Sequence, residues 1–200
     1  MIHPIETESY RILGTRVDLS DLDPGARAVV ERVIHASADM EYATSMVVDD
    51  TAVDAGVRAL CAGAPVVCDV EMVRHGIRGA TAECCLRDHA PTDEREQTRA
   101  ALGMRVAAAR HPAGAIVVVG CAPTALDEVL ALATRGEFDP ALVIGMPVGF
   151  VGAAESKARL RASGLPAISN VGEKGGSAVA AAAVNALVRI AAQPPEGTTT

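Results

Sequence analysis

The chain has 200 residues, half of them hydrophobic, and its 18 basic and 25 acidic side chains give a formal net charge of −7. This length corresponds to one domain, and the composition excludes intrinsic disorder, a collagen-like fibre and a coiled coil. The acidic balance disfavours electrostatic binding to nucleic acid or to an anionic membrane surface.

Short β-branched runs alternate with alanine-rich helical windows along the chain. The first clear helix begins at Pro24, with Asp23 as its N-cap, and continues past His35. In chain order we then expect a strand at Thr44–Val48, a helix near Thr51–Cys61, strands at Pro65–Asp69 and Glu83–Leu86, a helix near Asp93–Ala109, a strand at Ile116–Gly120, a helix near Thr124–Thr134, a strand at Ala141–Ile144, a helix near Ala153–Ala162, a strand at Ala167–Ser169 and a helix near Ser177–Ala192.

This succession of elements predicts an α/β fold. Apolar strand runs without polar alternation are typical of strands covered on both faces, and strand–helix–strand order predicts right-handed crossovers in a parallel sheet. We expect one domain over residues 1–192, with three layers (α/β/α) and a mainly parallel sheet of five or six strands. Residues 193–200 are expected to form a flexible tail.

The helix that begins at Pro24 places one histidine away from its apolar face. At 100° per residue, the side chains that face the core fall within an arc of about 140°, and His35 lies about 160° from its centre. His35 therefore points toward solvent, a partner subunit or a cleft, and solvation alone would explain it. The predicted core residues of this helix are Ala26, Val29, Val30, Val33 and Ile34.

Several common functional signatures are missing from the sequence. It contains no phosphate-binding P-loop, no His-Glu-x-x-His and no Gly-x-Ser-x-Gly motif. The five cysteines form no Cys-x-x-Cys pair, so we expect neither a metal site nor a disulfide framework. Residues 1–12 carry charges where a signal peptide would be apolar, and no apolar run approaches the ~20 residues of a membrane span. We therefore expect a cytoplasmic protein with no membrane partner.

Two glycine-rich loops, Gly145–Gly152 and Gly175–Ser177, leave predicted strands and open helices. Backbone N–H groups at a helix N-terminus favour anions, and ligands of parallel sheets bind at the carboxyl ends of the strands. Tight turns without a ligand would explain either loop alone. Arginines at positions 87, 95, 99 and 105 could bind carboxylates in bidentate fashion or form surface ion pairs.

His75 follows a predicted strand, together with Asp69, Glu71 and Arg74. Assistance in catalysis and a structural ion-pair cluster both explain this group. The residues alone therefore indicate an α/β protein that binds an anionic small molecule.

Segments along nearly the whole chain carry a resemblance to a known family. The most specific is Gly145–Lys157, which reads GMPVGFVGAAESK. The others are Ile5–Ile12, Arg32–Ala36, Gly63–Gly76, Leu86–Asp88, Thr98–Arg99, Ala122–Leu126, Lys174–Ala178 and Ala183–Leu187. Together they resemble the precorrin-8X methylmutases, including the cobalt-precorrin-8 methylmutases.

The resemblance implies an isomerase of cobalamin biosynthesis. Such an enzyme moves a methyl group from C-11 to C-12 of precorrin-8X or cobalt-precorrin-8, giving hydrogenobyrinic or cobyrinic acid. It also implies a flavodoxin-like fold, no cofactor, and a homodimer whose active site lies near the subunit interface. His35 corresponds to the catalytic histidine of the family. Ser9 corresponds to the family's substrate-contacting serine. Because such a substrate carries several carboxylate arms, we assign contacts with them to Arg87, Arg99, Lys174 and the N–H groups of Gly175, Gly176 and Ser177, and we expect Thr124 to bind the substrate as well.

The chain departs from the family pattern at two places. Cys121 stands where the family usually has Asn, which removes a hydrogen-bonding group beside the expected ligand. Ser37-Ala38 replaces Thr-Gly or Cys-Gly after the His35-Ala36 pair, at the end of that helix. Since both changes leave His35 in place, we expect activity. Two other functions also fit: a corrinoid carrier without turnover, and a nucleotide-dependent Rossmann-like enzyme that uses the loop Gly145–Gly152.

Overall fold

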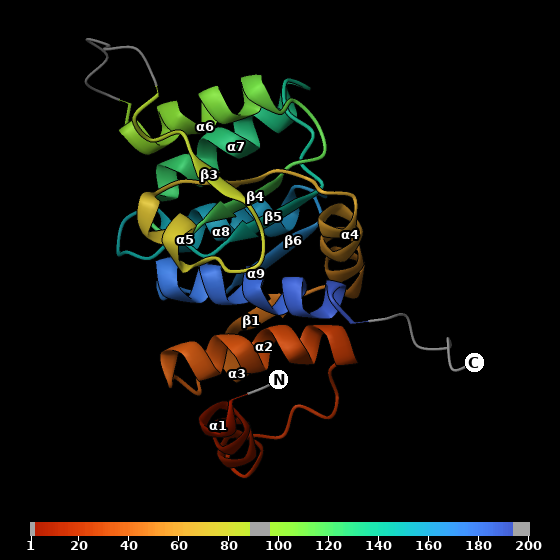
Figure 1. Ribbon diagram of the computed structural model, residues 1–200. Coiled ribbons are helices and arrows are strands. Elements are labelled where there is room, and N and C mark those ends of the chain that lie inside the picture. The colour runs from red at the N-terminus through yellow and green to blue at the C-terminus, as the bar shows by residue number, and fades with distance from the viewer. Residues whose placement is uncertain (1–2, 89–96, 194–200) are drawn as a thin grey trace.

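The computed structural model describes residues 3–88 and 97–193, which form a six-stranded sheet covered by helices on both faces (Figure 1). The strands lie in the order β1-β6-β5-β4-β2-β3. All neighbouring strands are parallel except β1, which pairs antiparallel with β6 at one edge. The mainly parallel sheet predicted from the sequence is confirmed. The strands are β1 (Met46–Val48), β2 (Val66–Cys68), β3 (Ala82–Cys84), β4 (Ile116–Val119), β5 (Leu142–Gly145) and β6 (Ala167–Asn170).

The parallel strands have the flavodoxin-like order. If β2 to β6 are counted from one to five, their order in the sheet is 2-1-3-4-5. The chain leaves β2 outward to β3 and then returns to β4 on the other side of β2. This reversal places the topological switch point, where ligands of open α/β sheets bind, outside the carboxyl ends of β2 and β4.

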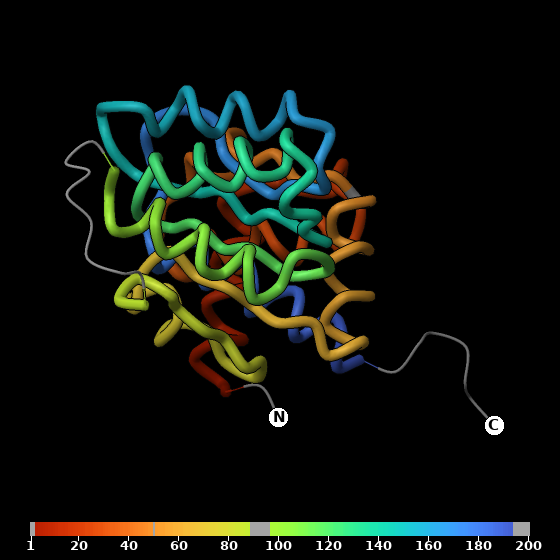
Figure 2. Tube along the Cα trace, turned by 90° about the horizontal axis from the view of Figure 1, so that it is seen from above, coloured from red at the N-terminus to blue at the C-terminus, as the bar shows by residue number. Residues whose placement is uncertain are grey.

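The helices form the outer layers of the fold (Figures 1 and 2). One face of the sheet is covered by α2, α4, α5 and α9, and the other by α6, α7 and α8. A further helix, α1, packs on the outside of α2, and the short α3 precedes β1. Their bounds are α1 (Pro4–Gly14), α2 (Pro24–Ser37), α3 (Tyr42–Ser45), α4 (Asp50–Cys61), α5 (Glu71–Gly76), α6 (Arg99–Arg110), α7 (Pro123–Thr134), α8 (Ala153–Ala162) and α9 (Ser177–Ala191).

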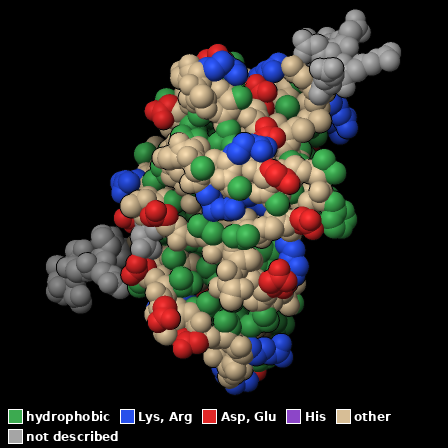
Figure 3. Space-filling model, turned by 180° about the vertical axis from the view of Figure 1, so that it is seen from behind, with side chains coloured by type: hydrophobic (Ala, Val, Ile, Leu, Met, Phe, Trp, Pro, Cys, Tyr) green, Lys and Arg blue, Asp and Glu red, His purple; other side chains and the backbone are tan. Residues whose placement is uncertain are grey.

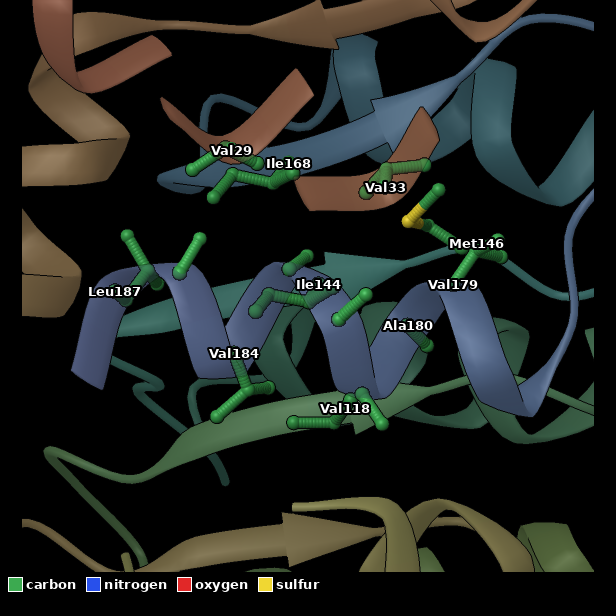
Figure 4. Packing of buried hydrophobic residues seen from close by; sticks show 14 of the residues in the cluster. Val29, Val33, Val118, Ile144, Met146, Ile168, Val179, Ala180, Val184 and Leu187 are labelled. Carbon is green, nitrogen blue, oxygen red and sulfur yellow. The ribbon is translucent and has the colours of Figure 1, made fainter. Parts of the chain in front are cut away.

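The core on the α2 side is built from small aliphatic side chains (Figure 4). In this view Val29 of α2 lies beside Ile168 of β6, and Val33 lies near Met146, just after β5. The central strands β4 and β5 are buried along their whole length, as expected for strands covered on both faces. All five residues predicted to form the core face of α2 are buried.

Several local predictions were wrong in their details. Asp23 is the N-cap of α2, but its side chain makes no capping hydrogen bond. The strand expected from Thr44 begins at Met46, because the preceding residues belong to α3. The strand expected at Glu83–Leu86 occupies Ala82–Cys84, since the chain turns soon afterwards.

Three helices, α1, α3 and α5, were not predicted. The helix expected to begin at Asp93 has its N-cap at Thr98, whose hydroxyl accepts a hydrogen bond from the Ala101 N–H. Residues 93–96 of that prediction, and 194–200 of the expected tail, lie outside the described residues.

The surface mixes charges of both signs. On the face shown in Figure 3, basic and acidic side chains alternate, with hydrophobic side chains between them. In residues 3–88 and 97–193, every helix is too short or too polar to cross a membrane.

Candidate active site

His35 lies in the last turn of α2 and is covered by α1. Ser9 Oγ and His35 Nδ1 are 2.7 Å apart in a hydrogen bond. The ring of Tyr10 stacks on the imidazole, with ring centroids 5.2 Å apart and an interplanar angle of 20°. The side chain is half-buried, and among the described residues Nε2 has no hydrogen-bond partner. The outward direction predicted for His35 is therefore toward a helix, and one ring nitrogen stays available to a ligand.

An ionic contact anchors α1, the helix that carries Ser9 and Tyr10. Glu6 Oε1 accepts hydrogen bonds of 2.7 Å from Arg32 of α2 and Arg189 of α9. Since all three side chains are partly shielded from solvent, this contact is better protected than a fully exposed pair. It fixes Ser9 and Tyr10 against His35.

Two hollows flank this group. Ser9 lines an open hollow of about 490 Å³, together with Pro4, Ile5, Glu8 and Ile12 of the same helix. Tyr10 lines a separate hollow of about 230 Å³ between α2 and α9. Ser9 and Tyr10 therefore each border a depression, and His35, which lines neither, contacts both of these residues.

Asp69 ties together the two strands at the switch point. Its side chain, only 1% exposed, follows β2 and accepts hydrogen bonds from the N–H groups of Gly120 (3.0 Å), Cys121 (2.8 Å) and Ala122 (2.9 Å) after β4. Burial raises the pKa of Asp69, and these N–H donors oppose that rise. Because all three donors are backbone N–H groups, the departure from Asn at Cys121 does not remove these bonds. The Cys121 thiol itself is exposed.

Thr124, Arg99 and Arg87 lie at or near the carboxyl edge of the sheet. Thr124, in the first turn of α7, shares a 2.6 Å hydrogen bond with the hydroxyl of Thr98, the N-cap of α6. Arg99 follows Thr98 directly, and Arg87 lies in the turn after β3. Both guanidinium groups are exposed and form no ion pair with another described residue. The structure therefore brings Thr124 and the start of Arg99's helix together.

Lys174 is already held by two carboxylates. Its Nζ donates 2.7 Å hydrogen bonds to Asp39 Oδ2 and Glu41 Oε2, which follow α2 in the chain. These bonds raise the pKa of Lys174 well above its usual range, and the bond from Lys174 lowers the pKa of Asp39. Lys174 thus connects the loop after β6 to the segment that follows His35.

The two glycine-rich loops pack against each other. The Gly176 N–H donates to the Met146 carbonyl (2.8 Å), and the Gly149 N–H donates to the Glu173 carbonyl (3.1 Å). A Cβ at Gly175 would lie 2.3 Å from the Met146 carbonyl oxygen, so the approach requires glycine. The Gly176 N–H is therefore occupied, and Ser177 begins α9 as a buried residue.

His75 is engaged within its own helix. Its Nδ1 lies 2.7 Å from the Glu71 carbonyl oxygen, and its Nε2 lies 3.2 Å from Arg74 Nη2. Arg74 also pairs with the Glu71 carboxylate at 2.6 Å. This geometry favours the structural ion-pair cluster over a proton-transfer role.

Sequence reasoning missed three features of this edge. Tyr10 gave no signal because α1 itself was not predicted. Lys157 of α8 is completely buried, a state that its place in a polar helix did not reveal. Phe150 and Val151 are 90% and 89% exposed. The chain has only two Phe residues, and one of them in a glycine-rich loop was a usable signal of an exposed apolar side chain.

Within the described part of the chain, no three His, Cys, Asp or Glu side chains are grouped as metal ligands would be.

The chain is similar to known proteins along most of its length. A sequence model of the precorrin-8X methylmutase family matches residues 4–190. The chain is 44% identical over 176 residues to a cobalt-precorrin-8 methylmutase of Methanothermobacter thermautotrophicus, covering 86% of this chain and 84% of that protein. It is 39% identical to a precorrin-8X methylmutase of Sinorhizobium sp., covering 92% and 93% of the two chains.

A solved structure is similar over almost the whole fold. The crystal structure of a precorrin-8X methylmutase from Thermus thermophilus superposes with a TM-score of 0.84 at 37% identity, covering 95% of this chain and 98% of that one. A match over that share of both chains extends beyond the sheet to the helices that surround it. The chain belongs to the precorrin-8X methylmutase family.

Proposed function

We propose that this chain moves a methyl group from C-11 to C-12 of precorrin-8X or cobalt-precorrin-8, with His35 as the proton donor. The observation that carries the proposal is the arrangement of the imidazole: Nδ1 is bonded to Ser9, the ring is stacked on Tyr10, and Nε2 is without a partner among the described residues. A ring held on one side and available on the other is suited to give a proton and take it back.

The proton balance follows from this geometry. In the imidazolium, Nδ1–H donates to Ser9 Oγ and Nε2–H goes to the conjugated macrocycle, which becomes electron-poor enough for the methyl group to migrate. The neutral ring keeps its proton on Nδ1, and the bare Nε2 recovers the other proton after migration. No electrons are exchanged with a cofactor, and the methyl group comes from the substrate itself. Acid–base catalysis of this kind contributes about 10²–10⁴ in rate.

The substrate carries several acetate and propionate arms, which need positive partners in a chain of net charge −7. We assign these contacts to Arg87 and Arg99, whose guanidinium groups are exposed, and to Thr124 beside Arg99's helix. Lys174 and the N–H groups of Gly175 and Ser177 complete the set, whereas the Gly176 N–H is already bonded to the Met146 carbonyl. A substrate carboxylate would compete with Asp39 and Glu41 for the Lys174 ammonium.

We further propose that the enzyme is a homodimer. The hollow beside Ser9 is open, and the loops after β5 and β6 project exposed apolar side chains that a second copy would cover. These side chains are Val148, Phe150, Val151 and Val171, called here the loop patch. The free cysteines among the described residues support a cytoplasmic location.

The test is conversion of precorrin-8X, followed by the change in its absorption spectrum. His35→Ala should lower kcat by about 10²–10⁴ while the Kd for hydrogenobyrinic acid stays within a few fold. His75→Ala is the matched control and should leave kcat unchanged, because both His75 nitrogens are engaged in α5. Turnover by His35→Ala near the wild-type rate would exclude the proton-donor role. Binding without turnover by the wild type would identify a carrier instead.

A further inference from the structure

Lys157 is a buried cation without a carboxylate partner. Its side chain is 0% exposed, and no salt bridge joins it to another described residue. Nζ instead donates hydrogen bonds to Asn170 Oδ1 (3.2 Å) and to the Lys174 carbonyl. Because an unpaired ammonium is costly to remove from water, an aliphatic side chain would suit a purely structural position better.

The two acceptors of Lys157 belong to the segment that links β6 to α9. Asn170 is the last residue of β6, and its Nδ2 donates to the same Lys174 carbonyl at 2.7 Å. That carbonyl therefore receives two donors, one from Lys157 and one from Asn170. The same segment is fixed to the loop after β5 by the Gly149–Glu173 and Gly176–Met146 backbone bonds.

We propose that Lys157 is a positioning residue for the substrate's carboxylates: its buried ammonium fixes the backbone between β6 and α9 and places a positive charge next to that backbone. This inference rests on the proposed function. The segment carries Lys174 and leads into the first turn of α9. A positive charge next to this segment favours the binding of anions to it. Lys157 touches no reacting atom and acts only through this segment.

The charge on Lys157 is sensitive to pH. Burial lowers the pKa of Lys157 to about 8, and the nearby Arg161 guanidinium contributes to the lowering. Arg161 is itself bonded to the Ser169 hydroxyl and the Asn170 carbonyl. The other charges of this region are Glu173 and Lys174 of the loop, with Asp39 and Glu41 paired to Lys174. Since the pKa of Asp39 is lowered and that of Lys174 is raised, this ion pair keeps its charges between pH 7 and pH 9.5, whereas Lys157 loses its charge in that range.

The experiment compares Lys157→Met with the wild type and with Arg159→Met, an exposed position of the same helix that pairs with Asp127. At pH 7, Lys157→Met should raise the KM for precorrin-8X and the Kd for hydrogenobyrinic acid about tenfold, with kcat within about threefold. The Tm should stay within a few degrees, since replacing a buried charge by an apolar side chain is often neutral. Arg159→Met should change none of these values.

A pH series gives a second measurement on the wild type and the variant. The wild-type KM should rise between pH 7 and pH 9.5 as the ammonium loses its proton, and this rise should be missing in Lys157→Met. Unchanged KM and Kd in the variant, equal losses in kcat and kcat/KM, or a flat wild-type KM would each overturn the inference. If Lys157→Met does not fold, Lys157→Gln takes its place in the same comparison. Failure of the wild type to bind hydrogenobyrinic acid would overturn the proposed function and this inference together.

Discussion

At the scale of single residues, the imidazole of His35 depends on two side chains from α1. Ser9 fixes Nδ1 by a 2.7 Å hydrogen bond, and the stacked Tyr10 fixes the plane of the ring. The Ser9 hydroxyl thus serves His35 directly. The resemblance to the family implied contact between Ser9 and the substrate, and the two roles are compatible because Ser9 also lines the open hollow.

Ser9→Ala should therefore lower kcat without removing activity. The lost hydrogen bond is worth about 1 kcal/mol, which corresponds to a loss of roughly five- to tenfold in rate. Single-turnover conversion of precorrin-8X measures the effect, and Thr7→Ala, on an exposed position of the same helix, is the control. A loss as large as that of His35→Ala would show that Ser9 takes part in the chemistry itself.

At the scale of elements, α1 is a short polar helix whose place depends on one carboxylate. Its only fully buried side chain is Leu13, so packing contributes little to holding the helix. Glu6, bonded to both Arg32 and Arg189, supplies the connection to α2 and α9. The position of Ser9 and Tyr10 relative to His35 follows from that connection.

Glu6→Gln should loosen α1 and reduce activity together. The neutral amide weakens both bonds to arginine, so amide hydrogen exchange over residues 4–14 should accelerate and kcat should fall about three- to tenfold. Glu137→Gln is the matched control, because Glu137 forms an exposed pair with Arg135 away from α1 and the candidate site. Faster exchange without any loss of kcat would show that the His35 geometry does not need the anchor.

The success of sequence reasoning differed between elements for physical reasons. Periodicity identified α2 and its five core residues because that helix is amphipathic against a single apolar core. The buried strands were equally clear, since short apolar runs between helical windows are typical of strands covered on both faces. By contrast, α1 and α5 carry few apolar residues, and tertiary contacts such as Glu6–Arg189, between residues 183 positions apart, determine where α1 lies.

The candidate site likewise contains residues that could be predicted from the sequence and residues that could not. His35 and Ser9 were singled out by their motif context, and the structure places them in contact. The buried state of Lys157 and the carboxylate clamp on Lys174 could not be predicted, because each joins segments that periodicity treats independently. For Asp69 the position at a strand end was clear, and its three backbone donors appear only when β2 and β4 become neighbours.

At the scale of the whole molecule, the candidate site of a single chain is open at the hollow beside Ser9, whereas the proposed function calls for the macrocycle to be enclosed. The hollow at Ser9 is bounded by α1 alone, and the loop patch exposes Phe150 and Val151 at 90% and 89%. Large side chains so exposed on adjacent loops are unusual for a surface that meets only water. In a two-fold dimer the same patch of each copy takes part in the interface, so one charge introduced there acts twice.

Phe150→Asp should therefore convert the proposed dimer into monomers and lower activity. Two buried carboxylates would repel each other and lose hydration, so the dimer Kd should rise at least about 100-fold, measured by sedimentation equilibrium over a range of concentrations. If both copies enclose the macrocycle, kcat/KM should fall with the dimer fraction and recover partly at high protein concentration. Val47→Asp changes another exposed apolar residue, on the edge strand β1, and should leave the dimer intact. A monomeric wild type, or a Phe150→Asp variant that stays dimeric, would contradict the assignment of the loop patch as the interface.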